Sequence, residues 1–310
     1  MISVKRILFH YCSSGLLVRA AAPLAVFLAL LLSGTAPQAA QPTATDDTRG
    51  LLWKIEGQNR KPSYLFGTIH VADPRVTNLP PPVRAAFDAA ERLFVEVVPD
   101  VESMAQLTQS MRFRNGRTLT QTIGAKMYAD VQTALAQRRI PVADIDALKP
   151  WAITVMLLTP DLSGGLPLDL ALQVRAAERG IAVEGLETMD EQIAVFDDLP
   201  LDDQRELLGV TLRDRDKVAG QIEALTQAYL ARDLDKLQAL AEADEIENSI
   251  LHATVMRRLL TDRNRRMVER MQSRLRRGSA FVAVGAAHLP GPQGLIKLLE
   301  REGYRLSAVY

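Results

Sequence analysis

Cysteine is almost absent from this sequence: among its 310 residues the only one is Cys12. Cys12 lies in a segment typical of a secretory signal, with basic side chains near its start, an unbroken apolar run from Ala20 to Leu32 and small residues after it. We expect residues 1–40 to be removed, which would leave a mature chain without cysteine. Disulfides, thiolate nucleophiles and cysteine-ligated zinc are then excluded.

A long apolar run is also missing. The stretch from Ala20 to Leu32 is short for a transmembrane helix, which needs about 20 residues. We therefore predict cleavage near residues 36–41 and no stable membrane span afterwards; the alternative is an uncleaved N-terminal anchor. The mature protein would be periplasmic or secreted, with a polar leader over residues 41–49 and a folded domain over residues 50–310.

Neither sign of charge is in large excess. The chain has 37 basic and 37 acidic side chains, and loss of the three basic residues of the predicted signal leaves 34 basic groups against 37 acidic ones. This balance lacks the basic surface that phosphate binding needs, so we expect no nucleic acid partner. The His-Glu-x-x-His, Walker A, dinucleotide-binding and Gly-x-Ser-x-Gly motifs are absent as well, and the last absence argues against a serine hydrolase.

Two parts of the chain repeat one order of elements. In the first, apolar runs at 51–56 and 63–66 predict a hairpin or two adjacent strands, and Gly67-Thr-Ile-His70, a proline-rich turn, a helix over 83–92 and a strand over 93–98 follow. In the second, a strand over 280–284 precedes Gly285-Ala-Ala-His288, a proline turn, a helix over 295–302 and a strand over 304–310. Strand–helix–strand crossovers normally join parallel strands. We therefore predict an α/β fold whose central mixed or parallel sheet is built from two half repeats with a large helical insertion.

The insertion is largely helical in its pattern. It predicts helices over 101–158 with breaks at Gly116, Gly124 and Pro141, a helix over 168–179 ended by Gly180, a core strand over 181–186, and helices over 201–276 with a polar break near Arg232.

Histidine is scarce, and only His70, His252 and His288 lie beyond the predicted signal. His70 and His288 each follow the C-terminal end of a predicted strand, where sites form in sheets with helical crossovers. We expect Gly67 and Gly285 to let the backbone turn sharply before each imidazole. The two histidines are predicted to share one site; the alternative is that each only satisfies its own turn. His252 has no such context and is expected on a helix surface.

Glu96 is the next candidate. It lies in the predicted strand over 93–98, on the side of Phe94 and Val98. A buried carboxylate needs a cation, a metal or hydrogen-bond donors. Because this strand follows the His70 turn, we expect Glu96 beside His70, and an edge strand with Glu96 in water is the alternative.

Further polar residues flank these candidates. Glu187 lies at the end of a predicted strand. Asp169 lies in the first turn of a predicted helix, where stabilising the helix dipole explains it at least as well as a role in a site. Asn264 falls on the apolar stripe of its helix and, with Arg263, predicts a buried polar network, whereas Arg266 is expected in solvent.

Two imidazoles and one or two carboxylates suit a divalent transition metal that activates water. The same set suits metal-free catalysis, in which one histidine is a general base oriented by a glutamate. Composition and spacing leave both readings open.

Several segments taken together resemble the TraB/GumN family: Trp53-Lys-Ile, Tyr64-Leu-Phe-Gly-Thr-Ile-His-Val71, Phe94-Val-Glu96, Gly185-Leu-Glu-Thr188 with Gln192, Arg263-Asn264 and Val284-Gly-Ala-Ala-His-Leu289. The likeness covers about residues 50–310. This family is similar to the Tiki metalloproteases, which trim Wnt proteins, and more distantly to erythromycin esterases and ChaN-like proteins.

The resemblance implies a metal-dependent, peptidase-like site that acts on a peptide or a small ester. It implies manganese or cobalt rather than zinc as the metal. The implied ligands are His70, Glu96 and His288; the implied catalytic set is Glu96, Glu187, Arg263 and Asn264, with Glu187 as a proton shuttle or extra ligand. A metal-free His/Glu esterase and a non-catalytic periplasmic binding or regulatory module are the alternatives.

Overall fold

The computed structural model describes residues 49–57, 61–160, 165–242, 246 and 248–310. The predicted signal and nearly all of the predicted leader lie outside the described residues. In the part of the chain that is described, no helix is long and apolar enough to cross a membrane.

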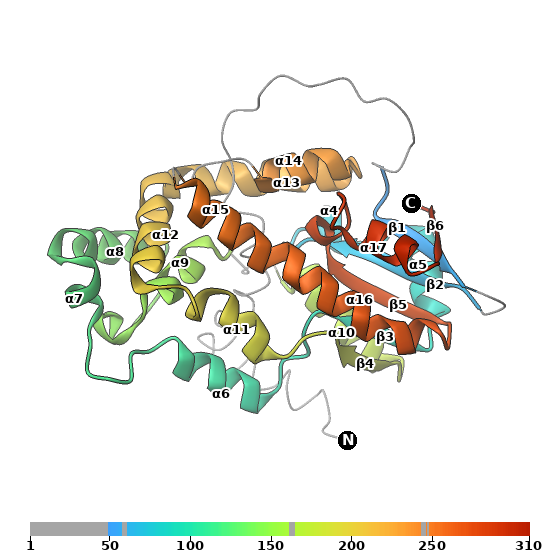
Figure 1. Ribbon diagram of the computed structural model, residues 1–310, viewed down its shortest axis with the longest axis horizontal. Coiled ribbons are helices and arrows are strands. Elements are labelled where there is room, and N and C mark those ends of the chain that lie inside the picture. Colours follow the sequence, from blue (N-terminus) through green and yellow to red (C-terminus); the bar gives the residue numbers. More distant parts are fainter. Residues whose placement is uncertain (1–48, 58–60, 161–164, 243–245, 247) are drawn as a thin grey trace.

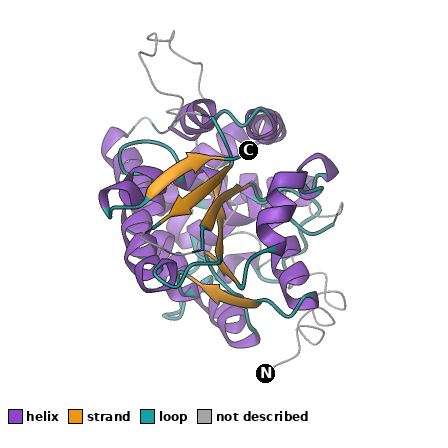
Figure 2. Cartoon of the chain, turned by 90° about the vertical axis from the view of Figure 1, so that its right-hand side faces the viewer, coloured by secondary structure: helices purple, strands orange, loops and turns teal. Residues whose placement is uncertain are grey.

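The centre of the fold is a mixed sheet of six strands in the order β4-β3-β5-β2-β1-β6 (Figures 1 and 2). The strand β1 is antiparallel to both of its neighbours, and β2, β5, β3 and β4 pair in parallel. The bounds are β1 Leu52–Glu56, β2 Ser63–Thr68, β3 Arg92–Val95, β4 Ala182–Gly185, β5 Ala280–Gly285 and β6 Arg305–Ala308. The predicted α/β class and the pairing of the first two strands are therefore confirmed.

The strand β5 lies between β2 and β3, although it comes from the far end of the chain. Thr68 at the end of β2 pairs with Gly285 at the end of β5, and Val95 at the end of β3 pairs with Ala283. Because parallel strands point the same way, the residues that follow β2, β3 and β5 leave the sheet at one edge.

Helices with apolar faces cover the sheet. Leu172 of one helix, Met271 of another and Leu299 of a third pack in one core with the strands. Figure 1 shows the longest of them lying across β3 and β5. The helices that pack on this core are α4 Pro74–Thr77, α5 Pro81–Asp88, α10 Leu168–Glu178, α13 Val218–Leu230, α14 Leu234–Glu242, α16 Asp262–Leu275 and α17 Leu295–Arg301.

The remaining helices build a second apolar core, centred on Trp151 and Phe196, whose rings stack with centroids 6.5 Å apart. In Figure 1 they extend to the left of the sheet. They are α6 Val101–Ser110, α7 Leu119–Ile123, α8 Ala125–Gln137, α9 Pro150–Leu158, α11 Met189–Asp197, α12 Leu201–Asp214 and α15 Ser249–Met256, with short turns at η2 Ile145–Ala147 and η3 Arg215–Lys217. The predicted breaks at Gly116, Gly124 and Pro141 all fall between these helices.

Three predicted elements differ from the structure. The helix expected over 83–92 ends at Asp88, and Arg92 already starts β3. The strand expected over 93–98 ends at Val95, so Glu96 follows the strand instead of lying within it. The strand expected in the core over 181–186 is β4 at the edge of the sheet, where it pairs with β3 alone.

Candidate functional site

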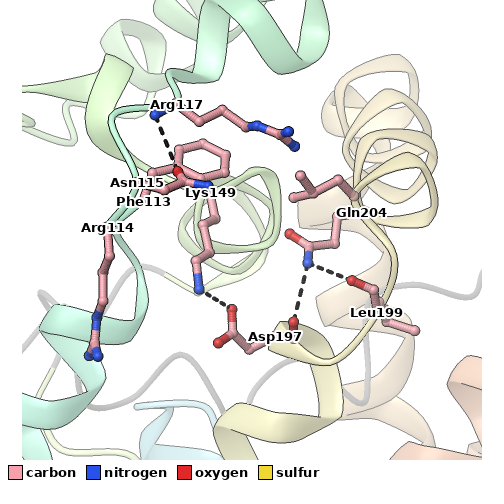
Figure 3. Close-up of a pocket in the computed structure, with 9 residues that line it drawn as sticks. Phe113, Arg114, Asn115, Arg117, Lys149, Asp197, Leu199 and Gln204 are labelled. Atoms are coloured by element: carbon pink, nitrogen blue, oxygen red, sulfur yellow. Dashed lines mark hydrogen bonds and ion pairs between the residues drawn. The ribbon is translucent and has the colours of Figure 1, made fainter.

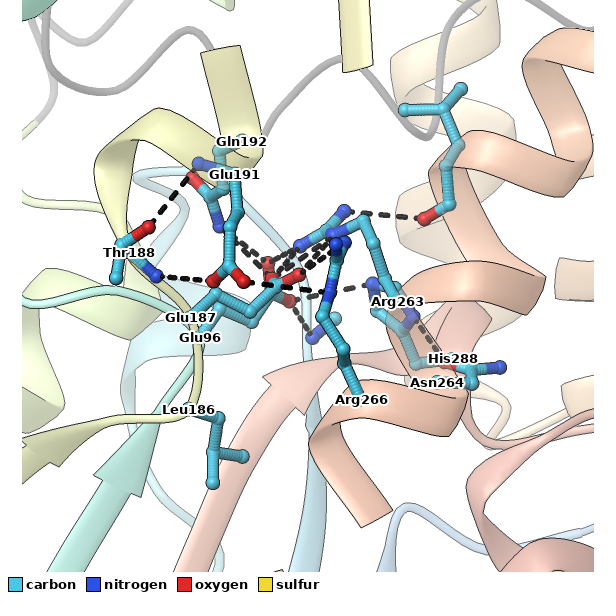
Figure 4. Close-up of polar contacts among 12 residues, drawn as sticks. Glu96, Leu186, Glu187, Thr188, Glu191, Gln192, Arg263, Asn264, Arg266 and His288 are labelled. Carbon is cyan, nitrogen blue, oxygen red and sulfur yellow. Dashed lines mark hydrogen bonds and ion pairs between the residues drawn. The ribbon is translucent and has the colours of Figure 1, made fainter. Parts of the chain in front are cut away.

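Four neighbouring parallel strands each lead into an acidic or imidazole side chain at their C-terminal ends. His70 follows β2, His288 follows β5, Glu96 follows β3 and Glu187 follows β4. Glu96, Glu187 and His288 are buried, and Figure 4 shows them converging on the helix α16. The sheet topology thus brings together residues that lie far apart in the sequence.

Gly285 marks the point where three of these side chains meet. A Cβ atom placed on Gly285 would lie 3.3 Å from Oε1 of Glu96, 3.6 Å from Cδ2 of His288 and 3.9 Å from Nε2 of His70. The amide of Gly285 donates a 2.7 Å hydrogen bond to Oε1 of Glu96. Nε2 of His288 lies 3.7 Å from the same oxygen. The two histidines and Glu96 therefore do lie together.

Asn264 fixes the orientation of His288. The Nδ2 amide of Asn264 donates to the carbonyl of Gln293 at 2.8 Å, so its Oδ1 faces Nδ1 of His288 at 2.6 Å. Because an amide oxygen only accepts, the proton of His288 is on Nδ1 and the lone pair is on Nε2. Burial and the charge of Arg263 lower the pKa of His288 to about 3. Its Nε2 has no hydrogen-bond partner among the described residues.

Asp169 has the same role for His70. Its carboxylate pairs with Nδ1 of His70 and also accepts from Oγ1 of Thr68. Burial alone would lower the pKa of His70, but the charge of Asp169 raises it above its ordinary value. Asp169 does lie in the first turn of α10, as expected, but its contact with His70 places it in the cluster. Nearby, the Tyr229 hydroxyl donates to the carbonyl of Gly67 at 2.9 Å.

Arg263 is buried between two carboxylates. Its Nη2 atom lies 2.6 Å from Oε2 of Glu96 and 2.7 Å from Oε2 of Glu187, and its Nε lies 3.0 Å from both oxygens of Glu187. Burial alone would raise the pKa of Glu96, but Arg263 and the two nearby imidazoles lower it to about 2. Gln192 adds longer contacts to both carboxylates, at 3.5 and 3.4 Å. The polar network predicted for Arg263 and Asn264 is present.

A π-helical turn, η4 Arg257–Thr261, leads directly into α16. Such turns add a residue to a helix and shift the faces that follow. The shift is followed immediately by Arg263 and Asn264, which both point into the buried cluster. Arg266 was expected in solvent, and this is only partly met: its side chain is 35% exposed and lies 3.7 Å from Glu187.

Gly67 and Gly285 have a different role from the expected one. Neither Gly67 nor Gly285 has a positive φ, and Gly285 is at φ −52°. A Cβ on Gly67 would lie 3.1 Å from the Cα of Ala286, in the short 3-10 turn η5 Ala286–His288. The absence of a side chain thus lets β2 and η5 approach closely, and no sharp turn at either glycine is needed.

Val98 and His252 also differ from what the sequence predicts. Val98 was expected on the face of Glu96 inside a strand; instead it lies beyond the strand and is 37% exposed. His252 lies on α15 with a partly buried side chain, so the expected surface position is only partly met.

Sequence reasoning missed Thr68 and Tyr229 and left Asp169 undecided. Neither Thr68 nor Tyr229 has a local signal, because each acts through a neighbour that folding brings to it. The signal for Asp169 was its position in the first turn of a helix. That position fits both stabilisation of the helix dipole and a role in the site.

The acidic and imidazole side chains of this cluster are not arranged as the ligands of a bound metal ion. Among the described residues, no group of three or more His, Cys, Asp or Glu side chains has an arrangement that could hold a metal ion as it stands. One oxygen of Glu96 is bound by Arg263 and the other by the Gly285 amide.

Comparison with known proteins identifies the family. Residues 51–308 match the TraB/PrgY/gumN family. The chain belongs to this family.

The curated relatives are metalloproteases by name. The chain is 26% identical to the metalloprotease TIKI2 of Danio rerio over 87% of this chain and 62% of that protein. It is 24% identical to the human metalloprotease TIKI1 over 90% of this chain and 67% of that protein. The chain thus spans less than two thirds of the length of the TIKI2 protein that it matches. No solved structure gives a significant match.

Proposed function

We propose that this member of the TraB/PrgY/gumN family is a metal-dependent, peptidase-like hydrolase. The names of its TIKI relatives support a hydrolase of this class. The single observation that carries the proposal is the meeting of His70, Glu96 and His288 around Gly285. These three residues would hold a divalent ion, and the family resemblance favours manganese or cobalt over zinc.

The side chains fit such an ion in one specific respect. Histidines that bind metals usually donate their second ring N–H to an oxygen acceptor, which fixes the ring and leaves the other nitrogen free. His70 faces Asp169 and His288 faces Asn264 through Nδ1. Nε2 of His288 is buried without a partner in the described structure. Binding would require that the three side chains draw closer together and that one oxygen of Glu96 coordinate the ion in addition to, or in place of, its contact with Arg263 or the Gly285 amide.

When bound, a divalent ion would polarise an amide or ester carbonyl and activate water. The chain's own residues orient the imidazole of His288 and balance the charges of the two carboxylates. Arg263 forms ion pairs with Glu96 and Glu187 in the buried cluster, and Asn264 holds the tautomer of His288. The resemblance implies that Glu187 is a proton shuttle or an extra ligand, whereas its contacts with Arg263 favour charge balance as its main role.

Metal-free catalysis is the second candidate, and one contact favours it. Asp169 behind Nδ1 of His70 makes a pair in which His70 can take a proton at Nε2 from water. The hydrolysed bond would then be an activated ester.

A chelator experiment separates the two candidates. Purified protein is assayed on a set of peptides and on simple esters, as prepared, after a strong chelator, and after adding back Mn²⁺, Co²⁺ or Zn²⁺. The proposal predicts peptide hydrolysis that chelation abolishes and Mn²⁺ or Co²⁺ restores. Ester hydrolysis that survives chelation would overturn it in favour of the metal-free reading. A biological effect retained in a His288→Ala variant without any hydrolysis would favour a binding or regulatory module.

We also propose that the chain is exported, and that its two strand–Gly-x-x-His–helix–strand segments are half repeats of one unit. The apolar run from Ala20 to Leu32 supports export. The placement of both histidines after neighbouring parallel strands supports the repeat. Mass spectrometry of the mature N-terminus tests export: a start near residues 36–41 is expected, and an intact Met1 in the periplasmic fraction would contradict cleavage.

A further inference from the structure

A cavity of about 320 Å³ opens at the surface of the helical region (Figure 3). The loop after α6, the start of α9 and the junction of α11 with α12 form its walls. Its lining includes Phe113, Arg114, Arg117, Lys149, Asp197 and Gln204. This volume is in the range of small-molecule sites.

The lining carries an excess of positive charge. Lys149 is paired with Asp197 at 2.5 Å, and Asp197 also accepts from the indole of Trp151 at 2.8 Å. Arg114 and Arg117 are exposed, and neither guanidinium contacts a carboxylate in the described structure. In Figure 3 the side chain of Arg117 reaches across the cavity toward α12. The cavity therefore has two cations that no carboxylate of the described residues neutralises.

Gln204 adds a second, independent observation. Its side chain is 1% exposed, and its Nε2 donates to the carbonyl of Leu199 at 2.8 Å. In Figure 3 its Oε1 is directed toward the cavity side, and this buried oxygen has no hydrogen-bond partner among the described residues. A buried acceptor without a donor is unfavourable. A ligand that carries an N–H group next to its anionic group would satisfy this acceptor.

We propose that this cavity binds the C-terminal end of a peptide. The terminal carboxylate lies against Arg117, with Arg114 at the rim, and the last amide N–H donates to Oε1 of Gln204. A peptide end combines these groups within one residue. Inorganic phosphate carries the charge but has no N–H group, and its only donor is an O–H on the same phosphorus as the anionic oxygens. The proposal concerns binding only and does not depend on a metal or on hydrolysis.

Calorimetry with defined peptides tests this assignment. The full-length mature protein is titrated with acetyl-tetra-alanine as the free acid, with the same peptide as its C-terminal amide, and with inorganic phosphate. Mass spectrometry afterwards confirms that the peptide is intact. The variant is Arg114→Ala/Arg117→Ala, and its matched control is Arg276→Ala/Arg277→Ala, which removes two exposed arginines just after α16. Circular dichroism checks that both variants are folded.

The free acid is expected to bind the wild type about tenfold or more tightly than the amide or phosphate, because the amide lacks the charged acceptor and phosphate lacks the N–H that bonds to Gln204. The Arg114→Ala/Arg117→Ala variant should bind the free acid more weakly by a similar factor, and the control variant should bind it like the wild type. Equal binding of acid and amide, or equal losses in both double variants, overturns the proposal. Phosphate that binds as tightly as the acid also overturns it, in favour of a general anion site.

Discussion

Nδ1 of His288 and Oδ1 of Asn264 lie 2.6 Å apart in the interior of the protein. This contact sets which nitrogen of the imidazole is free. A change at Asn264 should therefore act on the site through the histidine and should also be felt in stability.

The Asn264→Leu variant removes the acceptor and leaves the buried Nδ1–H without a partner. We expect the free energy of unfolding to fall by about 1–3 kcal/mol, the cost of an unsatisfied buried polar group. We expect the affinity for a divalent ion to fall about 10–100-fold, as for other residues that orient metal-binding histidines. Urea unfolding and metal titration measure the two effects. Wild-type values for both would show that the contact has no orienting role.

Asp169 has two explanations that one pair of variants can separate. Asp169 lies in the first turn of α10, and Asp202 lies in the first turn of α12. Both favour their helix by about 0.3–1 kcal/mol, but only Asp169 contacts His70. Asp169→Ala should weaken metal binding about 10–100-fold, while Asp202→Ala should leave it unchanged. Equal metal affinities in the two variants would assign Asp169 to the helix dipole alone.

Arg263 neutralises two buried carboxylates, so its loss should be costly. Arg263→Met removes the cation closest to both Glu96 and Glu187, and we expect about 3–5 kcal/mol of stability to be lost. Adding Glu187→Met removes one uncompensated charge and should restore part of that loss. Chemical denaturation of the wild type, both single variants and the double variant measures the coupling. If the losses of stability in the two single variants simply add in the double variant, the two residues are not coupled. That result would contradict the prediction.

Glu191 provides a stability effect that depends on pH. Hydrogen bonds from Arg270 lower its pKa from 4.5 to about 2. A lowered pKa in the folded state stabilises above the unfolded value, so this contribution is complete above about pH 4.5 and is lost as the pH falls toward 2. Glu191→Gln keeps a cap for the Thr188 amide but removes the charge. We expect it to cost about 1–2 kcal/mol at pH 7 after allowance for solvent screening.

The measurement for Glu191 is urea unfolding of wild type and Glu191→Gln at pH 7, 5, 4 and 3. The difference between the two proteins should be constant from pH 7 to 5 and should shrink below that. A difference that stays constant down to pH 3 would show that the pair with Arg270 contributes nothing through charge.

The strands that lead into the site were accessible from the sequence because their signals are local. Apolar runs that end in Gly-x-x-His marked β2 and β5, and Glu187 was correctly placed after its strand. The order β3-β5-β2 was not accessible, because it depends on pairing between segments from opposite ends of the chain. That pairing alone puts His70 and His288 side by side.

The partners of the site were harder to predict than its members. Arg263 and Asn264 could be predicted because Asn264 interrupts the apolar stripe of its helix. A polar residue on that inward face stands out in the sequence. The role of Asp169 was not resolved, since a first-turn acid serves the helix dipole and a distant imidazole equally well in sequence. The glycines were found for the wrong reason: close packing against η5, which no local pattern records, replaces the expected turn.

The central claim is that His70, Glu96 and His288 hold one divalent ion. Elemental analysis tests it most directly, on protein stripped of metal and then equilibrated with Mn²⁺, Co²⁺ or Zn²⁺ before excess ion is removed. The account predicts about one ion per wild-type chain, with little uptake by the His70→Ala/His288→Ala variant, whose fold is checked by circular dichroism. Equal uptake by the wild type and the folded double variant would contradict the account.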